Sequence, residues 1–192
     1  SHSEVRMVPV MSLGIPILVS AVIVFVASSI IHMVLPFHRN DLQKLAKENE
    51  VMDLLRRFNI PPGDYLVPHA GSPAGMKKPE FLEKMKKGPI VLMTIAPGGP
   101  PSMGTNLLLW FLYSVVVSVF AGYIASRALG PGANYLAVFR FGGASAFMGY
   151  SLALLQNSIW YKRNWGTTLK TTFDGLVYGL LTAGTFGWLW PR

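Results

Sequence analysis

The residues best suited to chemistry lie near the C-terminus, inside an apolar stretch. Lys170 and Asp174 are four residues apart, and Tyr178 follows four residues later. In a helix this spacing places the three side chains on one face. Gln156 and Asn157 lie near the matching end of the preceding apolar stretch. We therefore expect the five residues to form a polar cluster between two membrane helices.

The predicted position of Asp174 within the bilayer leaves two interpretations open. A charge inside a membrane is costly, so it is usually paired or functional. In the functional interpretation Asp174 serves a proton or ion relay, or contacts another subunit. In the structural one Lys170 neutralises Asp174, while Gln156 and Asn157 satisfy hydrogen bonds.

Histidines and carboxylates elsewhere give no second site. His32 ends the first apolar stretch, whereas His38 and His69 fall outside the apolar stretches, so a haem held by two histidines of this chain is not expected. The alternative is a haem or pigment shared with another subunit through His32. Because the chain has no cysteine, disulfides and thiolate chemistry are excluded. We predict no cofactor, no metal site, no catalytic residue and no enzyme activity.

Long apolar stretches must position these residues. Four of them cover residues 12–35, 107–126, 135–160 and 168–190, and about 20 apolar residues are enough to cross a bilayer as a helix. The sequence therefore predicts an all-α integral membrane protein with four transmembrane helices. Residues 1–37 would form the N-terminal tail and first helix, 38–106 a polar segment with two short helices, and 107–192 the other three helices.

The net charge of +8 has its main explanation in the membrane. Basic residues beside apolar spans set orientation and meet anionic lipids, and no motif supports nucleic-acid binding. The distribution of Lys and Arg predicts a cytoplasmic segment 38–106 with both termini outside. We expect anionic headgroups to contact six basic residues: Lys77, Lys78, Lys84, Lys86, Lys87 and Arg140. For Arg140, a carboxylate of a partner protein is the alternative.

Small residues recur four apart in the last apolar stretch, which is typical of closely packed membrane helices. The fourth stretch carries Gly175, Gly179, Ala183 and Gly187. The third offers Gly142, Ala146, Gly149 and Ala153. These residues predict either an internal helical hairpin or a contact with a second protein.

Several segments carry a resemblance that covers most of the chain: ALGPGANYLAVFRF, LLQNSIWYKRNW, TTFDGLVYGLLTAGTFGWLWP, IPPGDY and MKKPEFLEKMKKGP. Together they resemble a family of small bacterial inner-membrane proteins of unassigned function. The resemblance implies a bacterial plasma membrane and no particular activity. We expect a non-catalytic accessory or assembly subunit of a larger bacterial membrane complex, respiratory or photosynthetic, in contact with other integral membrane subunits. The alternative is a small homo-oligomeric transporter or channel that uses Asp174.

Overall fold

The computed structural model describes residues 7–192, which divide into two compact units. The first unit contains residues 7–42 and 102–192, and the second is Gln43–Pro101. The first six residues of the predicted N-terminal tail lie outside the described residues. The division falls inside the predicted polar segment 38–106, so that residues 38–42 belong with the helices of the first unit.

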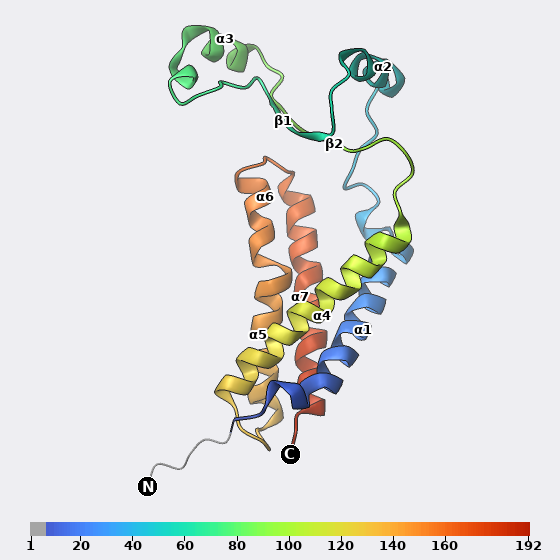
Figure 1. The fold of residues 1–192 in the computed structure, drawn as a ribbon, viewed down its shortest axis with the longest axis vertical. Coiled ribbons are helices and arrows are strands. Elements are labelled where there is room, and N and C mark those ends of the chain that lie inside the picture. Colours follow the sequence, from blue (N-terminus) through green and yellow to red (C-terminus); the bar gives the residue numbers. More distant parts are fainter. Residues whose placement is uncertain (1–6) are drawn as a thin grey trace. The chain divides into compact units, whose positions relative to one another are not determined.

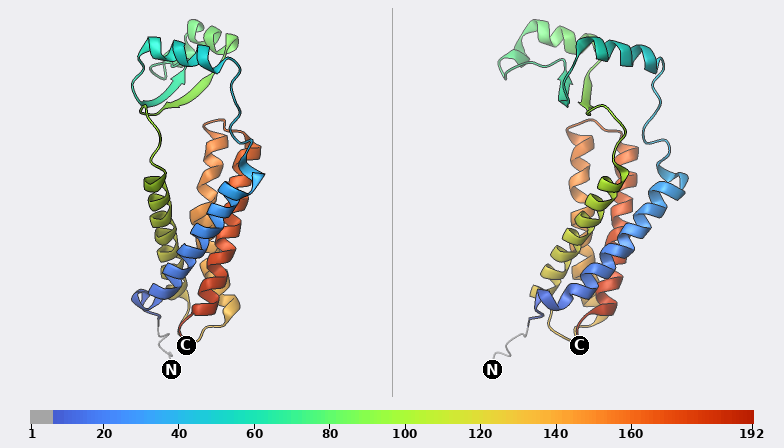
Figure 2. Two further views of the ribbon diagram at one scale, coloured as in Figure 1. Left: turned by 90° about the vertical axis from the view of Figure 1, so that its right-hand side faces the viewer. Right: turned by 45° about the vertical axis from the view of Figure 1, so that its right-hand side comes forward.

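The first unit is a helical bundle (Figures 1 and 2). It begins with the 3-10 turn η1 (Val10–Leu13), helix α1 (Gly14–Ser29), the π-helical turn η2 (Ile30–Val34) and the 3-10 turn η3 (Pro36–His38). After the second unit come α4 (Met103–Ala128), α5 (Tyr135–Tyr150), the 3-10 turn η5 (Leu152–Leu154), α6 (Leu155–Ile159) and α7 (Trp165–Leu189). At one end of the bundle, the C-terminal segment is joined to the loop between α4 and α5, because Trp190 Nε1 donates to the Gly130 carbonyl at 3.0 Å.

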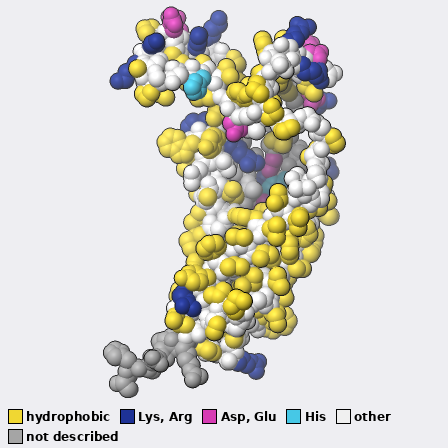
Figure 3. All heavy atoms as spheres, viewed as in Figure 1, with side chains coloured by type: hydrophobic (Ala, Val, Ile, Leu, Met, Phe, Trp, Pro, Cys, Tyr) yellow, Lys and Arg dark blue, Asp and Glu magenta, His cyan; other side chains and the backbone are white. Residues whose placement is uncertain are grey.

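Within the described residues, three helical stretches are long and apolar enough to cross a membrane: Val10–Val34, Met103–Ala128 and Tyr135–Ile159. The prediction of four such helices is therefore shown only in part. Helix α7 has the length, but its threonines and glycines, with Lys170 and Asp174, make it less apolar than the other three. Figure 3 shows hydrophobic side chains covering the visible face of the bundle.

The predicted third span is not one continuous helix. Ser151 leaves helical geometry between α5 and η5, with φ −129° and ψ −48°. Its hydroxyl donates to the carbonyl of Thr172 on α7 at 3.1 Å. Gly175 faces the same point, where an added Cβ would lie 1.8 Å from Ser151 Oγ. The break thus gives α7 a close polar contact that a straight helix would not offer.

Helices α5 and α7 pack together through small residues. A Cβ added to Gly179 would lie 3.1 Å from Phe147 Cβ, and one added to Gly187 would lie 2.7 Å from the Tyr135 ring. Ala183 is fully buried and would meet a Cβ added to Gly143 at 2.7 Å. All four small residues predicted on α7 therefore lie on its contact face with α5.

The α5 side of this contact differs from the prediction. Ala146 is buried, and Gly142 lies opposite Phe186 of α7. Gly149, still within α5, instead faces Val117 of α4. Ala153 is exposed in η5, because the break at Ser151 changes the helical phase after α5. Gly143, which was not predicted, takes part in the contact with α7.

Hydrogen bonds between polar side chains link the helices inside the bundle. Ser20 Oγ of α1 donates to Ser118 Oγ of α4 at 2.8 Å. Trp110 Nε1 of α4 donates to Ser28 Oγ of α1 at 2.7 Å. Such contacts, together with close backbone packing, are what hold helices together where lipid removes the hydrophobic drive.

The second unit contains α2 (Glu48–Phe58), β1 (Gly63–Val67), the 3-10 turn η4 (Gly75–Lys77), α3 (Pro79–Lys87) and β2 (Val91–Ile95). Strands β1 and β2 pair antiparallel, with Gly63 opposite Ile95 and Val67 opposite Val91. The two expected helices are present, but the unit also contains this two-stranded sheet, so the all-α prediction is shown only in part. The 23 residues between the two strands leave no local signal of their pairing.

The contact between α5 and α7 generates a prediction. Gly179→Leu should destabilise the protein by about 1–3 kcal/mol, because the new side chain overlaps the Phe147 backbone and forces the helices apart. Leu180→Ala, whose parent side chain is half exposed, should have a smaller effect. Thermal unfolding in mild detergent measures both variants. A stable Gly179→Leu with an unstable Leu180→Ala would contradict the packing.

Candidate metal centre

A proline-directed turn after α1 brings two histidines together. Leu35 has extended backbone angles (φ −79°, ψ 143°), as steric contact with the following proline requires. Pro36 then begins η3, where its missing N–H costs nothing. This turn brings His38 back beside His32, with ring centroids 4.4 Å apart.

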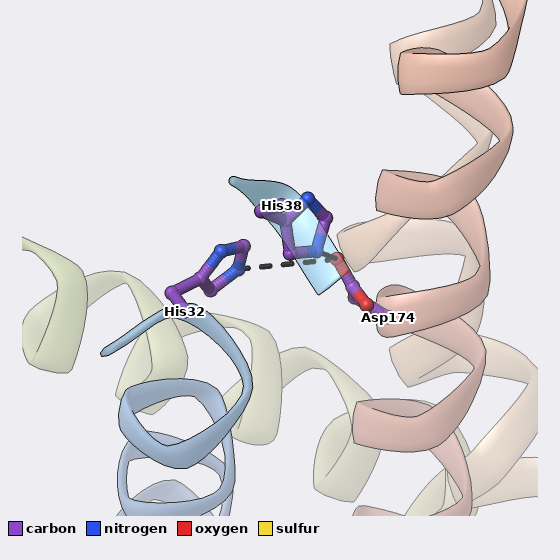
Figure 4. Close-up of side chains that lie close together, drawn as sticks. All are labelled: His32, His38 and Asp174. Carbon is purple, nitrogen blue, oxygen red and sulfur yellow. Dashed lines mark ion pairs between the residues drawn. The ribbon is translucent and has the colours of Figure 1, made fainter. Parts of the chain in front are cut away.

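Asp174 of α7 meets both histidines (Figure 4). Its Oδ2 lies 2.8 Å from Nε2 of His38 and 3.9 Å from Nε2 of His32. The side chain of Asp174 is 3% exposed, that of His38 12% and that of His32 42%. One ligand atom from each residue lies within 4.8 Å of the other two.

The short contact between His38 and Asp174 lacks the geometry of a hydrogen bond. Nε2 of His38 and Oδ2 of Asp174 are both buried, and neither has a hydrogen-bond partner among the described residues. Buried polar atoms without partners are rare, because each one loses its hydration without compensation. The contact therefore does not satisfy either atom in the way a hydrogen bond would.

Asp41 and Lys170 hold His38 from the other side. Nδ1 of His38 lies 2.6 Å from Oδ2 of Asp41. Lys170 Nζ donates to Oδ1 of Asp41 at 3.0 Å and to the carbonyl of Phe37 at 2.9 Å. The three residues thus fasten the turn that carries His38 onto α7.

The same contacts set the acidity of Asp41. The hydrogen bond from His38, followed by that from Lys170, lowers the pKa of Asp41 below its ordinary value of 3.8. A carboxyl with a lowered pKa stabilises the fold above that ordinary value. The contribution is lost as the pH falls through the lowered pKa.

The structural interpretation paired Lys170 with Asp174, but Lys170 pairs with Asp41 instead. The two residues share one face of α7, but the lysine precedes the acid, which is the less favourable order for an i,i+4 pair. Asp41 and the Phe37 carbonyl instead offer Lys170 two acceptors on the adjacent turn.

The predicted polar cluster is only partly assembled. Tyr178 is buried, and its hydroxyl lies 3.4 Å from Nε2 of His32. Gln156 is exposed and Asn157 half-buried on α6, and within residues 7–192 no side-chain hydrogen bond joins either to Asp174. Ser158 makes the contact across this end of the helices, through a 2.8 Å hydrogen bond to Thr168.

The arrangement suits a small cation better than a haem. The His32 and His38 rings are tilted by only 31° and lie 4.4 Å apart, which leaves no room for a porphyrin between them. Metal–ligand bonds of about 2.1 Å place the ligand atoms of a tetrahedral ion about 3.4 Å apart. The distances of 2.8 and 3.9 Å to Asp174 lie on either side of that value.

The basic residues predicted to meet lipid are divided between the two units. The five predicted lysines are exposed on η4, α3 and the residue between them, all within the second unit. Arg140 is exposed on α5 and lines a groove of about 220 Å³ that also includes Gly143, Leu176 and Leu180. No lipid contact follows from exposure alone.

Sequence reasoning missed His38 and Asp41, and it predicted no metal ligands. Both were assigned to the polar segment, because they follow the first apolar stretch. The available signal was Pro36 between His32 and His38, since a proline directly after a helix often turns the chain back. No local sequence signal indicated that Asp174 of α7 would meet His38.

Comparisons with family models, with curated proteins and with solved structures found no match. The centre is therefore interpreted from its geometry.

Proposed function

We propose that this protein is a membrane protein that binds one divalent transition-metal ion, such as Zn²⁺, through His32, His38 and Asp174. One observation carries the proposal, namely two buried acceptors that face each other. A carboxylate only accepts hydrogen bonds, so Nδ1 of His38 carries the proton in its contact with Asp41. In the neutral imidazole, Nε2 then presents a lone pair to the carboxylate oxygen of Asp174, 2.8 Å away.

The chemistry of the donor set supports a transition metal. Two imidazoles and one carboxylate suit Zn²⁺ and its neighbours in the first transition row. The contact with Asp41 resembles the carboxylate–histidine–metal arrangement that fixes the tautomer of a ligating histidine. Three protein ligands would leave a position open, as in sites that bind or transfer a further ligand.

A proton shared by His38 and Asp174 is the competing explanation. It would satisfy the two facing acceptors without any metal, as a charged histidine between two carboxylates. The third donor favours the metal, because His32 Nε2 also approaches Oδ2 of Asp174 and a shared proton does not require it.

Metal titration of the purified chain in non-ionic detergent tests the proposal. Zn²⁺ competed against a chromophoric chelator should bind at one ion per chain. His38→Ala and Asp174→Asn should each weaken binding by about 100-fold or more, and Asp41→Asn by about 10- to 100-fold, since it only orients His38. The matched control is His69→Ala, an exposed histidine of the second unit, which should bind as the parent does. Absence of stoichiometric zinc in the parent would leave the shared proton as the explanation.

We also propose that α7 is a fourth transmembrane helix, in a bacterial inner membrane. Its polar residues Thr168, Asp174 and Thr182 are buried. Its exposed residues are mostly large and apolar, namely Leu169, Phe173, Leu176, Leu180 and Trp188. The low average hydropathy of α7 therefore arises on the face that lipid would not meet.

The proposed orientation places segment 38–106 in the cytoplasm and both termini outside. Because the chain lacks cysteine, single cysteines at His69 and at Arg192 can be labelled in intact cells with an impermeant maleimide. Residue 192 should react and residue 69 should not. Labelling at residue 69 but not at residue 192 would contradict this orientation and indicate the opposite one.

Two roles are compatible with a metal-binding membrane protein. The first is a non-catalytic accessory subunit of a larger membrane complex, in contact with anionic lipid and other subunits. The second is a small homo-oligomeric transporter, which the convergence of His32 and His38 on Asp174 favours. Native mass spectrometry after gentle extraction distinguishes them, because the first predicts co-extracted subunits and the second copies of this chain alone.

A further inference from the structure

A groove of about 410 Å³ opens beside Asp174, between the segment η2–η3 and α7. It is lined by Ile31, Leu35, Pro36, Phe37, Phe173 and Asp174. Five of these side chains are apolar, so Asp174 is the sole polar group in the lining. The volume lies within the range of small-molecule sites, which is about 300–1,000 Å³.

The negative charge of Asp174 and the apolar wall together decide which class of ligand fits the groove. A carboxylate in an apolar wall repels anions, and an uncharged lipid gains nothing from its charge. A hydrated inorganic cation gains nothing from the apolar wall. A cation with a large apolar body satisfies both parts, because its charge pairs with Asp174 and its body covers the wall.

Two aromatic rings strengthen this selection. Phe37 is 41% exposed and Phe173 is 56% exposed, so each ring has free surface beside the groove. The face of an aromatic ring attracts cations, especially quaternary ones. Phe37 already attracts one, since Lys170 Nζ lies 5.3 Å from its ring centroid.

We propose that this groove binds a monovalent lipophilic cation, such as a quaternary ammonium or phosphonium compound, with its charge against Asp174. The groove and the proposed metal centre share Asp174, but the binding of the cation does not rest on the metal. His32 and His38 do not line the groove. The two ligands should therefore compete for one carboxylate from different sides.

The test uses the full chain in non-ionic detergent and two probes of the same shape. Tetraphenylphosphonium, measured by isothermal titration calorimetry, should bind at one site per chain. Tetraphenylborate, which has the opposite charge, should show no saturable binding. Equal binding of both probes by the parent protein would overturn the proposal without any variant.

Variants then locate the site. Asp174→Asn should weaken phosphonium binding by about tenfold or more, because it removes the charge and keeps the shape. Phe173→Ala should weaken it by about three- to tenfold. Leu180→Ala, an exposed change elsewhere on α7, should have no effect. Unchanged binding in Asp174→Asn would contradict the proposal.

His38→Ala separates this inference from the proposed function. It should lose zinc and keep phosphonium, because His38 ligates the metal but does not line the groove. In the parent, added Zn²⁺ should weaken phosphonium binding. Intact zinc binding without phosphonium binding would refute the groove alone, and the reverse result would refute the metal centre alone.

Discussion

A carboxylate buried in a helix that packs inside an apolar bundle must find a cation, and this requirement governs the structure around Asp174. Its side chain is 3% exposed, so water compensates little of its charge. Desolvating a carboxylate costs several kcal/mol even after relaxation of the protein, which only a good partner offsets. The turn at Pro36 returns His38 to α7, where its Nε2 lies 2.8 Å from Oδ2 of Asp174 and the two residues can hold that cation together. Asp41 and Lys170 then fix the turn, so four charged or titratable groups depend on one another.

Close helix packing makes this arrangement possible. The small residues of α7 let it approach α5 closely, so that a Cβ added to Gly179 would lie 3.2 Å from backbone atoms of Phe147. Helix α7 is thereby held on its small-residue face, and the centre forms where that helix meets the end of α1. The outward face of α7 is correspondingly apolar, with Phe173 next to Asp174 in the sequence but exposed. One helix thus combines a polar centre, a packing face and a face suited to lipid.

The sequence predicted the parts of this fold that depend on local pattern. Apolar runs located the long helices, and the four-residue spacing located the packing face of α7. The same spacing identified Asp174 and Tyr178 as neighbours. It failed for Lys170 because two acceptors on another segment outcompete Asp174. It failed for His38 and Asp41 because their position depends on the direction of the chain after Pro36, which no periodicity encodes. The break at Ser151 and the pairing of β1 with β2 were likewise decided by tertiary contacts.

The central claim is that His38 and Asp174 share a metal ion with His32, and X-ray absorption at the zinc edge tests it most directly. The account predicts an ordered ligand shell at about 2.0–2.1 Å with the outer scattering of two imidazoles. In His38→Ala the contribution of one imidazole should disappear. A spectrum of fully hydrated zinc in the parent protein, or the same spectrum with and without His38, would contradict the account.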